Sequence, residues 1–328
     1  MTSSSRKIVK LTVPGGVDPI RLDRYLAAQI ELGLSRNKIQ WLIDQGDITV
    51  NGSPQNASYS VAAEDRISVT LPEPTPTDVL PQNIPLEILF EDEVLAVINK
   101  PAGMVTHPAA GVHEGTLANA LVYHFEQLRK VKGHNRPGIV HRLDKGTSGL
   151  LLVAKDEKTL QLLQQSMEKR EIHREYLALV CGHMPEEKGT IDLPIGRSPN
   201  ERTKMAVGGT GGRESVTHYE LADRYRLYDL LKVRLETGRT HQIRVHLTYL
   251  HHPVFADPEY GGREKWHKGI FAPERLLGKR LLKLIDHQAL HARKLTFVHP
   301  VTIKTITCEA PAPPDFQAVL DLLNQSGR

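Results

Sequence analysis

The sequence contains little cysteine, since only Cys181 and Cys308 among its 328 residues carry a thiol. Two thiols so far apart exclude a disulfide scaffold and a zinc site built from cysteine pairs. The chain also lacks any apolar run near the ~18 residues that a transmembrane helix requires. Its first ten residues, MTSSSRKIVK, lack the apolar core of a signal peptide. These absences predict a soluble, cytosolic protein that has no disulfide framework and does not enter a membrane.

Charge is nearly balanced, with 42 Lys+Arg against 38 Asp+Glu and a net charge of +4. The excess is concentrated in two segments. Residues 129–145 hold six Lys+Arg and one Asp, and residues 263–283 hold seven Lys+Arg and two Glu. Such clusters suit a polyanion, because neutralising phosphates releases counterions. The alternative for either cluster is a solvated basic surface without a partner.

Five prolines within residues 72–85 indicate a semi-rigid extended linker. It separates a small module, residues 17–71, from a large domain, residues 86–328, and we expect residues 1–16 to form a flexible tail. In the large domain, strand-like and helix-like patterns alternate without a regular βαβ rhythm. We therefore predict the α+β class: a mixed, mainly antiparallel sheet flanked by helices, preceded by a small N-terminal α/β module.

The small module contains a helix with cations at an unfavourable end. Ser35 is a suitable N-cap, and Gly46 follows the last helical residue. Arg36 and Lys38 fall in the first turn, where the helix dipole disfavours positive charge. A bound phosphate would remove this conflict. The alternative is that exposed basic residues there cost only about a few tenths of a kcal/mol and have no function.

The segment RLDRYLAAQIELGLSRNKIQWLIDQGDITVNG, residues 21–52, resembles an S4 domain, a small RNA-binding module. The signature consists of RLD, then LSR before the second helix, then G-x-I-x-VNG. The resemblance implies that Arg36 and Lys38 face RNA phosphates.

The densest polar motif is HRLDKGTSGLLLVAK, residues 141–155. Two glycines permit a tight turn into an apolar strand, so Asp144 is expected on a loop at the mouth of that strand. Its neighbours include Arg136, His141, Arg142 and Lys145. Positive charge nearby favours an ionised carboxylate, which suits a nucleophile or base. The alternative is a structural Arg–Asp pair that braces the turn.

A second motif, ETGRTHQIRVHL at residues 236–247, predicts a basic helix after Gly238. A metal site is disfavoured, because no H-E-x-x-H pattern or cysteine pair accompanies the histidines and arginine does not ligate metals. This holds also for His287 and His291, which have the spacing of one helical turn. The pattern favours phosphate contact, with one arginine of the helix paired with Asp144.

The motifs HRLDKGTSGLL, REYLAL, LETGRTHQIRVHL, DPEYGG and LHARKLTFVHP, in this order, resemble the RluA/RluD family of pseudouridine synthases. The resemblance implies that Asp144 is the catalytic aspartate and that Tyr176 lies against the target base. It makes Arg244 the partner of the aspartate, with Arg239 as a second candidate. It places Leu295 beneath the aspartate as an apolar support.

The resemblance also implies RNA contacts. Arg142 matches the residue that fills the gap left by a flipped nucleotide, and His141 and Arg239 are expected to contact RNA beside it. Ala256, in FADPEYGG, stands where the family pattern leads us to expect glycine.

The implied reaction is the isomerisation of uridine to pseudouridine in large-subunit (23S) ribosomal RNA, free or within a 50S particle or its precursor. It needs no redox step and no group transfer, so we expect no cofactor and no metal. We expect a monomer. Two alternatives remain at this stage: a glycosylase that releases the flipped base, and a non-catalytic RNA-binding or ribosome-assembly factor.

Overall fold

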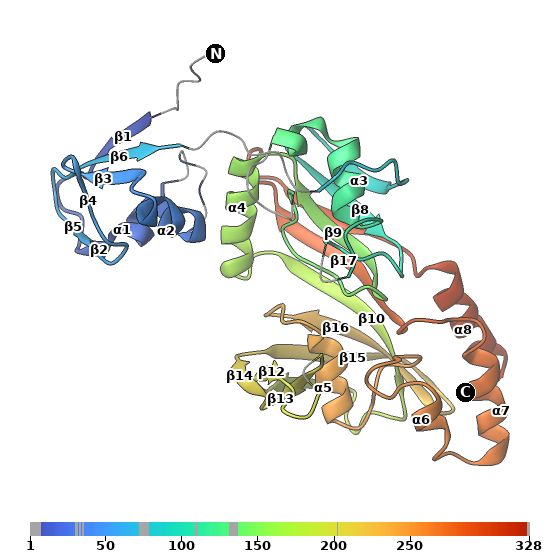
Figure 1. The fold of residues 1–328 in the computed structure, drawn as a ribbon. Helices are drawn as coiled ribbons and strands as arrows, with labels where there is room; N and C mark the ends of the chain where they lie inside the picture. The colour runs from blue at the N-terminus through green and yellow to red at the C-terminus, as the bar shows by residue number, and fades with distance from the viewer. Residues whose placement is uncertain are drawn as a thin grey trace.

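The computed structural model (Figure 1) describes residues 8–29, 32, 34, 36–71, 79–108, 111–130, 137–201 and 203–326. Ser35 and Arg136, on which two predictions depended, lie outside these ranges. No helix within the described residues combines the length and apolar composition of a membrane span.

The N-terminal module has its own sheet and its own core. The four-stranded sheet has the order β1-β6-β3-β4, and β2 pairs with β5 separately. Helices α1 and α2 pack their apolar stripes into the same core, which includes Leu22, Leu26, Ile39 and Leu42. The elements are β1 (Ile8–Thr12), β2 (Ile20–Arg21), α1 (Leu22–Ala27), α2 (Arg36–Asp44), β3 (Ile48–Val50), β4 (Ser53–Pro54), β5 (Ser60–Val61) and β6 (Arg66–Thr70).

The predicted flexible tail, residues 1–16, is wrong for its second half. Ile8–Thr12 form β1, which pairs antiparallel with all five residues of β6. Val13 is completely buried. The alternation of apolar and polar residues in IVKLT gives the strand a half-buried face. The alternation covers only five residues and follows a polar N-terminal segment, so it was not recognised as a strand from the sequence.

The predicted linker, residues 72–85, is too long at its C-terminal end. Val79 is buried in the core of the large domain. The Asn119 side chain donates to the Leu80 carbonyl at 2.8 Å, and the Gln82 N–H donates to the Asn119 carbonyl at 3.1 Å. Residues 79–85 therefore lie against the large domain, because extended proline-rich backbone still offers carbonyls as acceptors.

The large domain is built on a nine-stranded sheet with the order β11-β15-β16-β10-β17-β9-β8-β7, in which β18 also pairs with β17. Among its described pairings, β9 with β17 is parallel and the others are antiparallel. The prediction of a mixed, mainly antiparallel sheet is confirmed. The strands are β7 (Glu87–Glu91), β8 (Leu95–Lys100), β9 (Ser148–Ala154), β10 (His173–Cys181), β11 (Lys188–Asp192), β15 (Val216–Tyr225), β16 (Tyr228–Leu235), β17 (Leu290–Val298) and β18 (Thr305–Glu309).

Helices cover both faces of this sheet. Residues of α3 and α5 join one apolar cluster, whereas α4 belongs to a second and α7 and α8 to a third. A separate small sheet has the order β13-β12-β14. The remaining elements are α3 (Leu117–His124), η2 (Glu126–Lys130), α4 (Glu157–Glu168), β12 (Ile195–Arg197), β13 (Met205–Val207), β14 (Thr210–Arg213), α5 (Gln242–Tyr249), α6 (Glu264–His267), α7 (Ala272–Leu281) and α8 (Pro314–Gln325).

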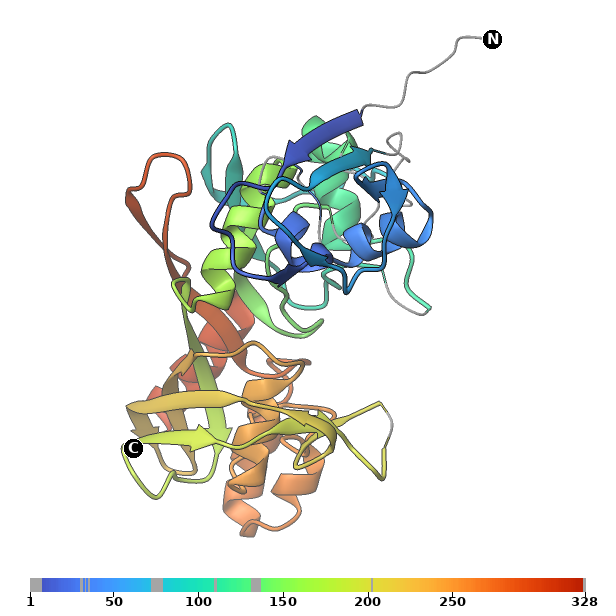
Figure 2. The same ribbon diagram turned by 90° about the vertical axis from the view of Figure 1, so that its left-hand side faces the viewer.

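Figures 1 and 2 show that the large domain has two halves at opposite ends of the sheet. One half contains β7–β9 with α3 and α4, and the other contains β11–β16 with α5–α7. Strands β10 and β17 pair side by side between them. Loops from both halves can therefore meet at the middle of the sheet.

Candidate active site

A cavity of about 530 Å³ lies where loops of the two halves meet. Its walls come from the loop before β9, the end of α4, the start of β10 and the loop that leads from β16 into α5. The lining includes Ile139, His141, Arg142, Leu143, Asp144, Met167, Arg170, Arg174, Tyr176, Leu235, Gly238, Arg239, His241, Ile243, Arg244 and Leu290. The two motifs that the sequence pointed to, HRLDK and GRTHQIR, thus face one space.

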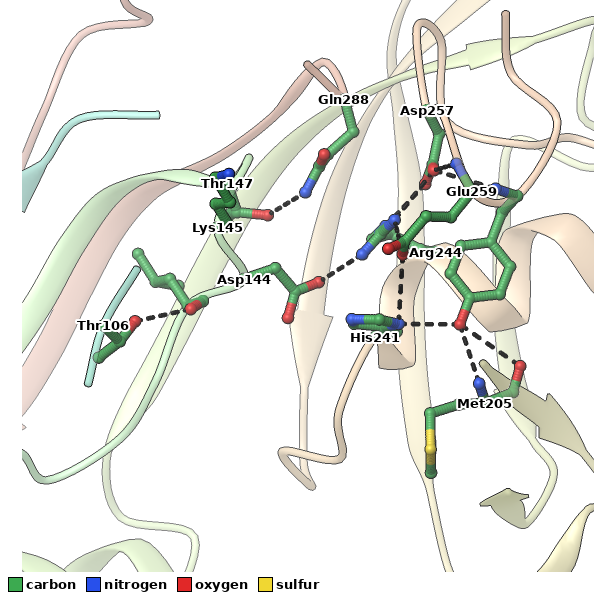
Figure 3. Close-up of polar contacts among 12 residues, drawn as sticks. Thr106, Asp144, Lys145, Thr147, Met205, His241, Arg244, Asp257, Glu259 and Gln288 are labelled. Carbon is green, nitrogen blue, oxygen red and sulfur yellow. Dashed lines mark hydrogen bonds and ion pairs between the residues drawn. The ribbon is translucent and has the colours of Figure 1, made fainter. Parts of the chain in front are cut away.

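Asp144 is presented by a loop with several anchors (Figure 3). The Thr147 N–H donates to the Asp144 carbonyl at 3.0 Å and closes the turn. The Thr106 hydroxyl donates to the Leu143 carbonyl at 2.7 Å, and the Gln288 amide donates to the Thr147 hydroxyl at 3.0 Å. These bonds tie the loop to other parts of the chain, so the carboxylate has a defined position.

The glycines of this loop are required by close approach. A Cβ on Gly146 would lie 2.3 Å from the Gln288 side-chain oxygen. Gly149 has a φ of +111°, and a Cβ there would lie 2.3 Å from the Ala292 carbonyl oxygen on the neighbouring strand. The prediction that the glycines allow a tight turn into the strand agrees with this geometry.

Asp144 pairs with Arg244, as predicted. Nη1 of Arg244 donates to Oδ2 of Asp144 at 3.1 Å, and the two side chains are 4% and 16% exposed. Arg239 is directed elsewhere, since its Nε donates to the Glu214 carbonyl at 3.1 Å. The second candidate for this pairing is therefore not the partner in the structure.

Arg244 is itself held by two further carboxylates (Figure 3). Its Nε and Nη2 donate to the two oxygens of Asp257 at 2.7 and 2.9 Å, and Nη2 also donates to Glu259 at 2.7 Å. Asp257 is completely buried and accepts the backbone N–H groups of Glu259 and Tyr260. A bidentate contact fixes the plane of a guanidinium, so Asp257 directs Nη1 of Arg244 towards Asp144.

Asp257 and Glu259 belong to the motif DPEYGG, for which the sequence predicted no role. These two acidic residues are natural candidates for the partners of Arg244, because a buried cation requires partners. The preceding Ala256 has a φ of +60°, in the left-handed region that favours glycine. The glycine expected from the family pattern fits this conformation better than alanine does.

The helix predicted over residues 239–250 begins later than expected. Helix α5 starts at Gln242, and His241 precedes it with a φ of +58°. The Gln242 side chain accepts the Arg239 N–H at 2.9 Å and the Thr237 hydroxyl at 2.8 Å, which stabilises a turn instead of a first helical turn. Arg239 and His241 therefore line the cavity from a loop.

His141 and Tyr176 are neutral members of the wall. His141 is buried, its Nε2 accepts the Leu152 N–H at 3.2 Å, and burial together with the charge of Arg174 lowers its pKa to about 3. It adds no positive charge near Asp144, contrary to expectation. Burial raises the pKa of the Tyr176 phenol, so this group stays protonated near neutrality. Arg142 is exposed at the rim of the cavity.

The predicted place of Leu295 is wrong. Its side chain packs in the cluster that contains Leu150 and Phe297 and does not line the cavity. Leu290, earlier on the same strand, lines the cavity instead. The register of β17 against β10 shifts at Glu175/Tyr176, so spacing along the motif LHARKL does not show which leucine lies by the site.

Lys100 supports the loop that carries Asp144. It is completely buried at the end of β8, where its Nζ donates to the carbonyls of Pro101, Met104 and Lys145 at 2.8, 2.9 and 3.4 Å. Burial lowers the pKa of this ammonium group to about 7, and the charge of Asp144 opposes the shift. No motif in the sequence marks this lysine.

In the N-terminal module, Arg36 has an acidic partner within the protein. Its Nη2 donates to the buried carboxylate of Asp23 at 2.8 Å, and Arg21 and Gln40 donate to the same group. The ammonium group of Lys38 lies 3.7 Å from the centre of the Trp41 ring. The Asp23 carboxylate therefore offsets the cation in the first turn of α2 without a bound phosphate.

Within the described residues, His, Cys, Asp and Glu side chains form no group of three or more able to hold a metal ion. His287 and His291 do not share a helix, since His291 belongs to β17. His287 instead bonds the Asp315 carboxylate, and His291 bonds the Ser148 hydroxyl.

Comparison with known proteins identifies the family of the chain. Residues 94–249 match the family model for RNA pseudouridylate synthase, and residues 20–67 match that of the S4 domain. A Xanthomonas campestris protein named ribosomal large subunit pseudouridine synthase D is 41% identical over 99% of this chain and 94% of its own. The chain belongs to the RNA pseudouridine synthase family. It is an isomerase that acts on RNA, and its N-terminal module is an RNA-binding S4 domain.

Other pseudouridine synthases agree with this assignment. A Synechocystis sp. protein described as an uncharacterized RNA pseudouridine synthase is 42% identical over 95% of this chain and 92% of its own. The structure of human RNA pseudouridylate synthase domain containing 1 is 26% identical, with a TM-score of 0.53 over 74% of this chain and 94% of that chain. A second human structure, domain containing 4, is 24% identical with a TM-score of 0.55 over 72% and 92%, and it supports the fold.

Proposed function

We propose that this pseudouridine synthase isomerises specific uridines in large-subunit (23S) ribosomal RNA, and that Asp144 is its catalytic group. The observation that carries the catalytic assignment is the contact between Asp144 and Arg244 in the wall of the cavity. The substrate class is supported by relatives whose names refer to the large ribosomal subunit. The reaction would then take place in the cytoplasm.

In this proposal the target uridine leaves its stack and enters the cavity, whose volume of about 530 Å³ suits a small ligand. Asp144 either attacks C1′ of the ribose or removes the 2′ proton. The N1–C1′ bond breaks and the uracil turns. C5 then forms the new bond to C1′, while the Asp144–C1′ bond breaks in the first route or Asp144 returns the proton to C2′ in the second. The proton on C5 then leaves, and N1 takes up a proton, so atoms and charge balance.

The remaining predicted residues support this sequence of steps. Tyr176 packs against the base, and its raised pKa favours that role over proton acceptance. Arg142, exposed at the rim, fills the gap in the RNA stack. Arg239 and His141 complete the wall beside it. Arg244 orients Asp144, and we assign the apolar support predicted beneath the aspartate to Leu290 rather than Leu295.

We also propose a division of labour between the parts of the chain. The S4 domain, residues 17–71 together with β1, selects the RNA, and Arg36 and Lys38 contact its phosphates from α2. The domain from residue 79 onward performs the chemistry. We propose that the protein acts as a monomer, and sedimentation at working concentration tests this.

Tritium release from RNA labelled at uridine C5 tests the reaction. We expect release by the wild-type protein in the presence of a chelator, because no step requires a metal or another cofactor. Asp144→Asn should abolish release, whereas Asp286→Asn, an exposed change outside the cavity, should not. Free uracil as the product would instead indicate a glycosylase, and loss of activity in chelator would contradict the metal-free mechanism.

Mapping of pseudouridines tests the substrate. We expect the 23S RNA of a strain lacking this gene to lose pseudouridine at defined positions, and the purified protein to restore it. Restoration on isolated RNA but not on 50S particles, or the reverse, identifies the form of the substrate. Unchanged 23S RNA together with a changed transfer RNA would overturn the ribosomal assignment while leaving the reaction intact.

A further inference from the structure

Arg174, on β10, is a buried cation without a counter-ion. The residue is 7% exposed, and it takes part in no ion pair among the described residues. Its Nε has no hydrogen-bond partner there, and its one hydrogen bond is a long contact of 3.5 Å from Nη2 to the Thr237 carbonyl. A guanidinium has five N–H donors, so most of them are unused in this structure.

A buried guanidinium without a counter-ion is energetically unfavourable unless a ligand supplies the negative charge. Burying a charge that lacks a partner opposes folding, and arginine does not lose its proton to relieve the cost. The other buried arginine of the cavity, Arg244, shows the usual solution, since three carboxylates surround it. Arg174 lines the same cavity, but among the described residues no carboxylate lies within ion-pair distance of it, although several carboxylates also line the cavity. The contrast indicates that an anion completes Arg174 from within the cavity.

The terminal nitrogens of Arg174 are the part of the side chain that an anion in the cavity can meet. Gly238 lies against the guanidinium, because a Cβ at this position would be 3.0 Å from Nη1. Nε of Arg174 is enclosed by protein atoms, and so is Nδ1 of the neighbouring His141. Contact with an anion therefore falls to Nη1 and Nη2 of Arg174.

The position along β10 relates Arg174 to the bound nucleotide. Tyr176, which we assign to the base, lies two residues further on, and this spacing corresponds to ~7 Å along a strand. Both side chains line the cavity. A nucleotide whose base lies at Tyr176 extends its ribose and phosphate over such a distance. We propose that Arg174 binds a phosphate of the flipped nucleotide through its terminal nitrogens.

This inference rests on the proposal that the cavity takes the target uridine. It differs from the role of Arg142, which is exposed at the rim, and from that of Arg244, whose donors are already used. A carbonyl oxygen of the uracil ring is a weaker fit, because a neutral acceptor leaves the buried charge uncompensated. The test separates the two.

The test is a binding cycle on an RNA stem-loop that carries the mapped target uridine. In one RNA the phosphate 5′ or 3′ to the target is replaced by an uncharged methylphosphonate, with 2′-fluoro at the flanking sugar in both RNAs so that the linkage survives. Wild-type protein should lose affinity by about tenfold to hundredfold at one linkage, in line with a charged hydrogen bond. Arg174→Gln should lose a similar factor on the natural RNA and no more than about twofold further on the neutral one.

Two more variants keep the result interpretable. Arg174→Lys should retain part of the dependence on the phosphate charge. Gly238→Ala keeps the charge but crowds Nη1, and it should weaken the same linkage specifically. If Arg174→Gln does not fold, these two carry the test.

The stability of the free protein gives an independent measure. Arg174→Met should leave the thermal unfolding midpoint unchanged or raise it while it lowers RNA affinity, because it removes an uncompensated buried charge. A merely structural arginine would show the reverse.

The proposal would be overturned if the affinity losses from Arg174→Gln and from the methylphosphonate multiply when the two changes are combined. It would also be overturned if Arg174→Gln binds the natural RNA with full affinity. Coupling to a 2-thio or 4-thio substitution of the uracil instead of the phosphate would overturn it in favour of base contact. If the wild-type protein makes no pseudouridine in the stem-loop, the proposed function itself has failed, and this is seen before any variant is compared.

Discussion

Asp257 should control the reaction without touching the RNA. Its carboxylate is completely buried and accepts hydrogen bonds from Nε and Nη2 of Arg244. Nη1 of Arg244 is therefore free to donate to Asp144. Asp257→Asn keeps the shape of the side chain but removes its charge and one acceptor. Arg244 is then free to turn away from Asp144, towards Glu259.

The expected magnitudes follow from these contacts. Removing one partner of a buried ion pair costs roughly 3–5 kcal/mol. Because asparagine retains one acceptor and Glu259 remains, we expect about 2–3 kcal/mol, or a fall in Tm of roughly 4–12 °C. A displacement of Asp144 by about 1 Å can lower a rate about a hundredfold. We therefore expect kcat to fall between about tenfold and a hundredfold with little change in KM.

The assay is steady-state pseudouridine formation below the unfolding temperature of each variant. Glu259→Gln is the matched control, because its side chain contacts the same guanidinium but is 48% exposed. It should cost less than about 1 kcal/mol and change kcat by less than about threefold. An Asp257→Asn protein that is destabilised but retains its wild-type kcat would refute a positioning role.

Three further predictions concern stability and binding. Hydrogen bonds from Arg21, Gln40 and Arg36 hold the pKa of Asp23 well below its ordinary value. Its contribution to the stability of the S4 domain is therefore complete above pH ~4 and is lost as the pH falls towards the lowered pKa. Acid titration of the S4 domain by NMR should show this loss of stability, and Asp23→Asn should remove the pH dependence. Gly149→Ala should cost more than about 3 kcal/mol in urea unfolding, because its Cβ meets the Ala292 carbonyl, whereas Gly111→Ala, also at positive φ but in open space, should cost about 1–2 kcal/mol. Deleting residues 1–71 should lower RNA affinity at least about tenfold but change the single-turnover rate less than about threefold; equal turnover of ribosomal RNA by both chains at low concentration would contradict this.

Much of the architecture could be predicted because local chemistry and tertiary structure agree. Aspartate is a favoured N-cap residue, and the Asp156 side chain accepts the Thr159 N–H at 2.8 Å at the start of α4. The loop that presents Asp144 could be located from its glycines and the apolar strand that follows. The residue types predicted that one arginine after Gly238 pairs with Asp144, and the family resemblance selected Arg244.

What could not be predicted depends on contacts between distant segments. The side chain of Gln242 decides where α5 begins, and the register shift in β17 decides which leucine reaches the cavity. The neutral state of His141 results from burial, and the missing counter-ion of Arg174 within the described residues results from how distant segments pack; a motif reveals neither. The alternation in β1 was visible in principle but too short to distinguish from a tail.

The position of β17 has a consequence for the timing of activity during synthesis. This strand lies between β10 and β9 and is the described link between the two halves of the sheet, yet it is made of Leu290–Val298, near the end of the chain. Asp144 and Arg244 come from different halves of the sheet. A growing chain therefore cannot hold these two side chains together until Val298, the last residue of β17, has left the ribosome. A growing chain can therefore bind RNA through its N-terminal domain long before it can modify it, and a chain ended early would occupy RNA without isomerising it.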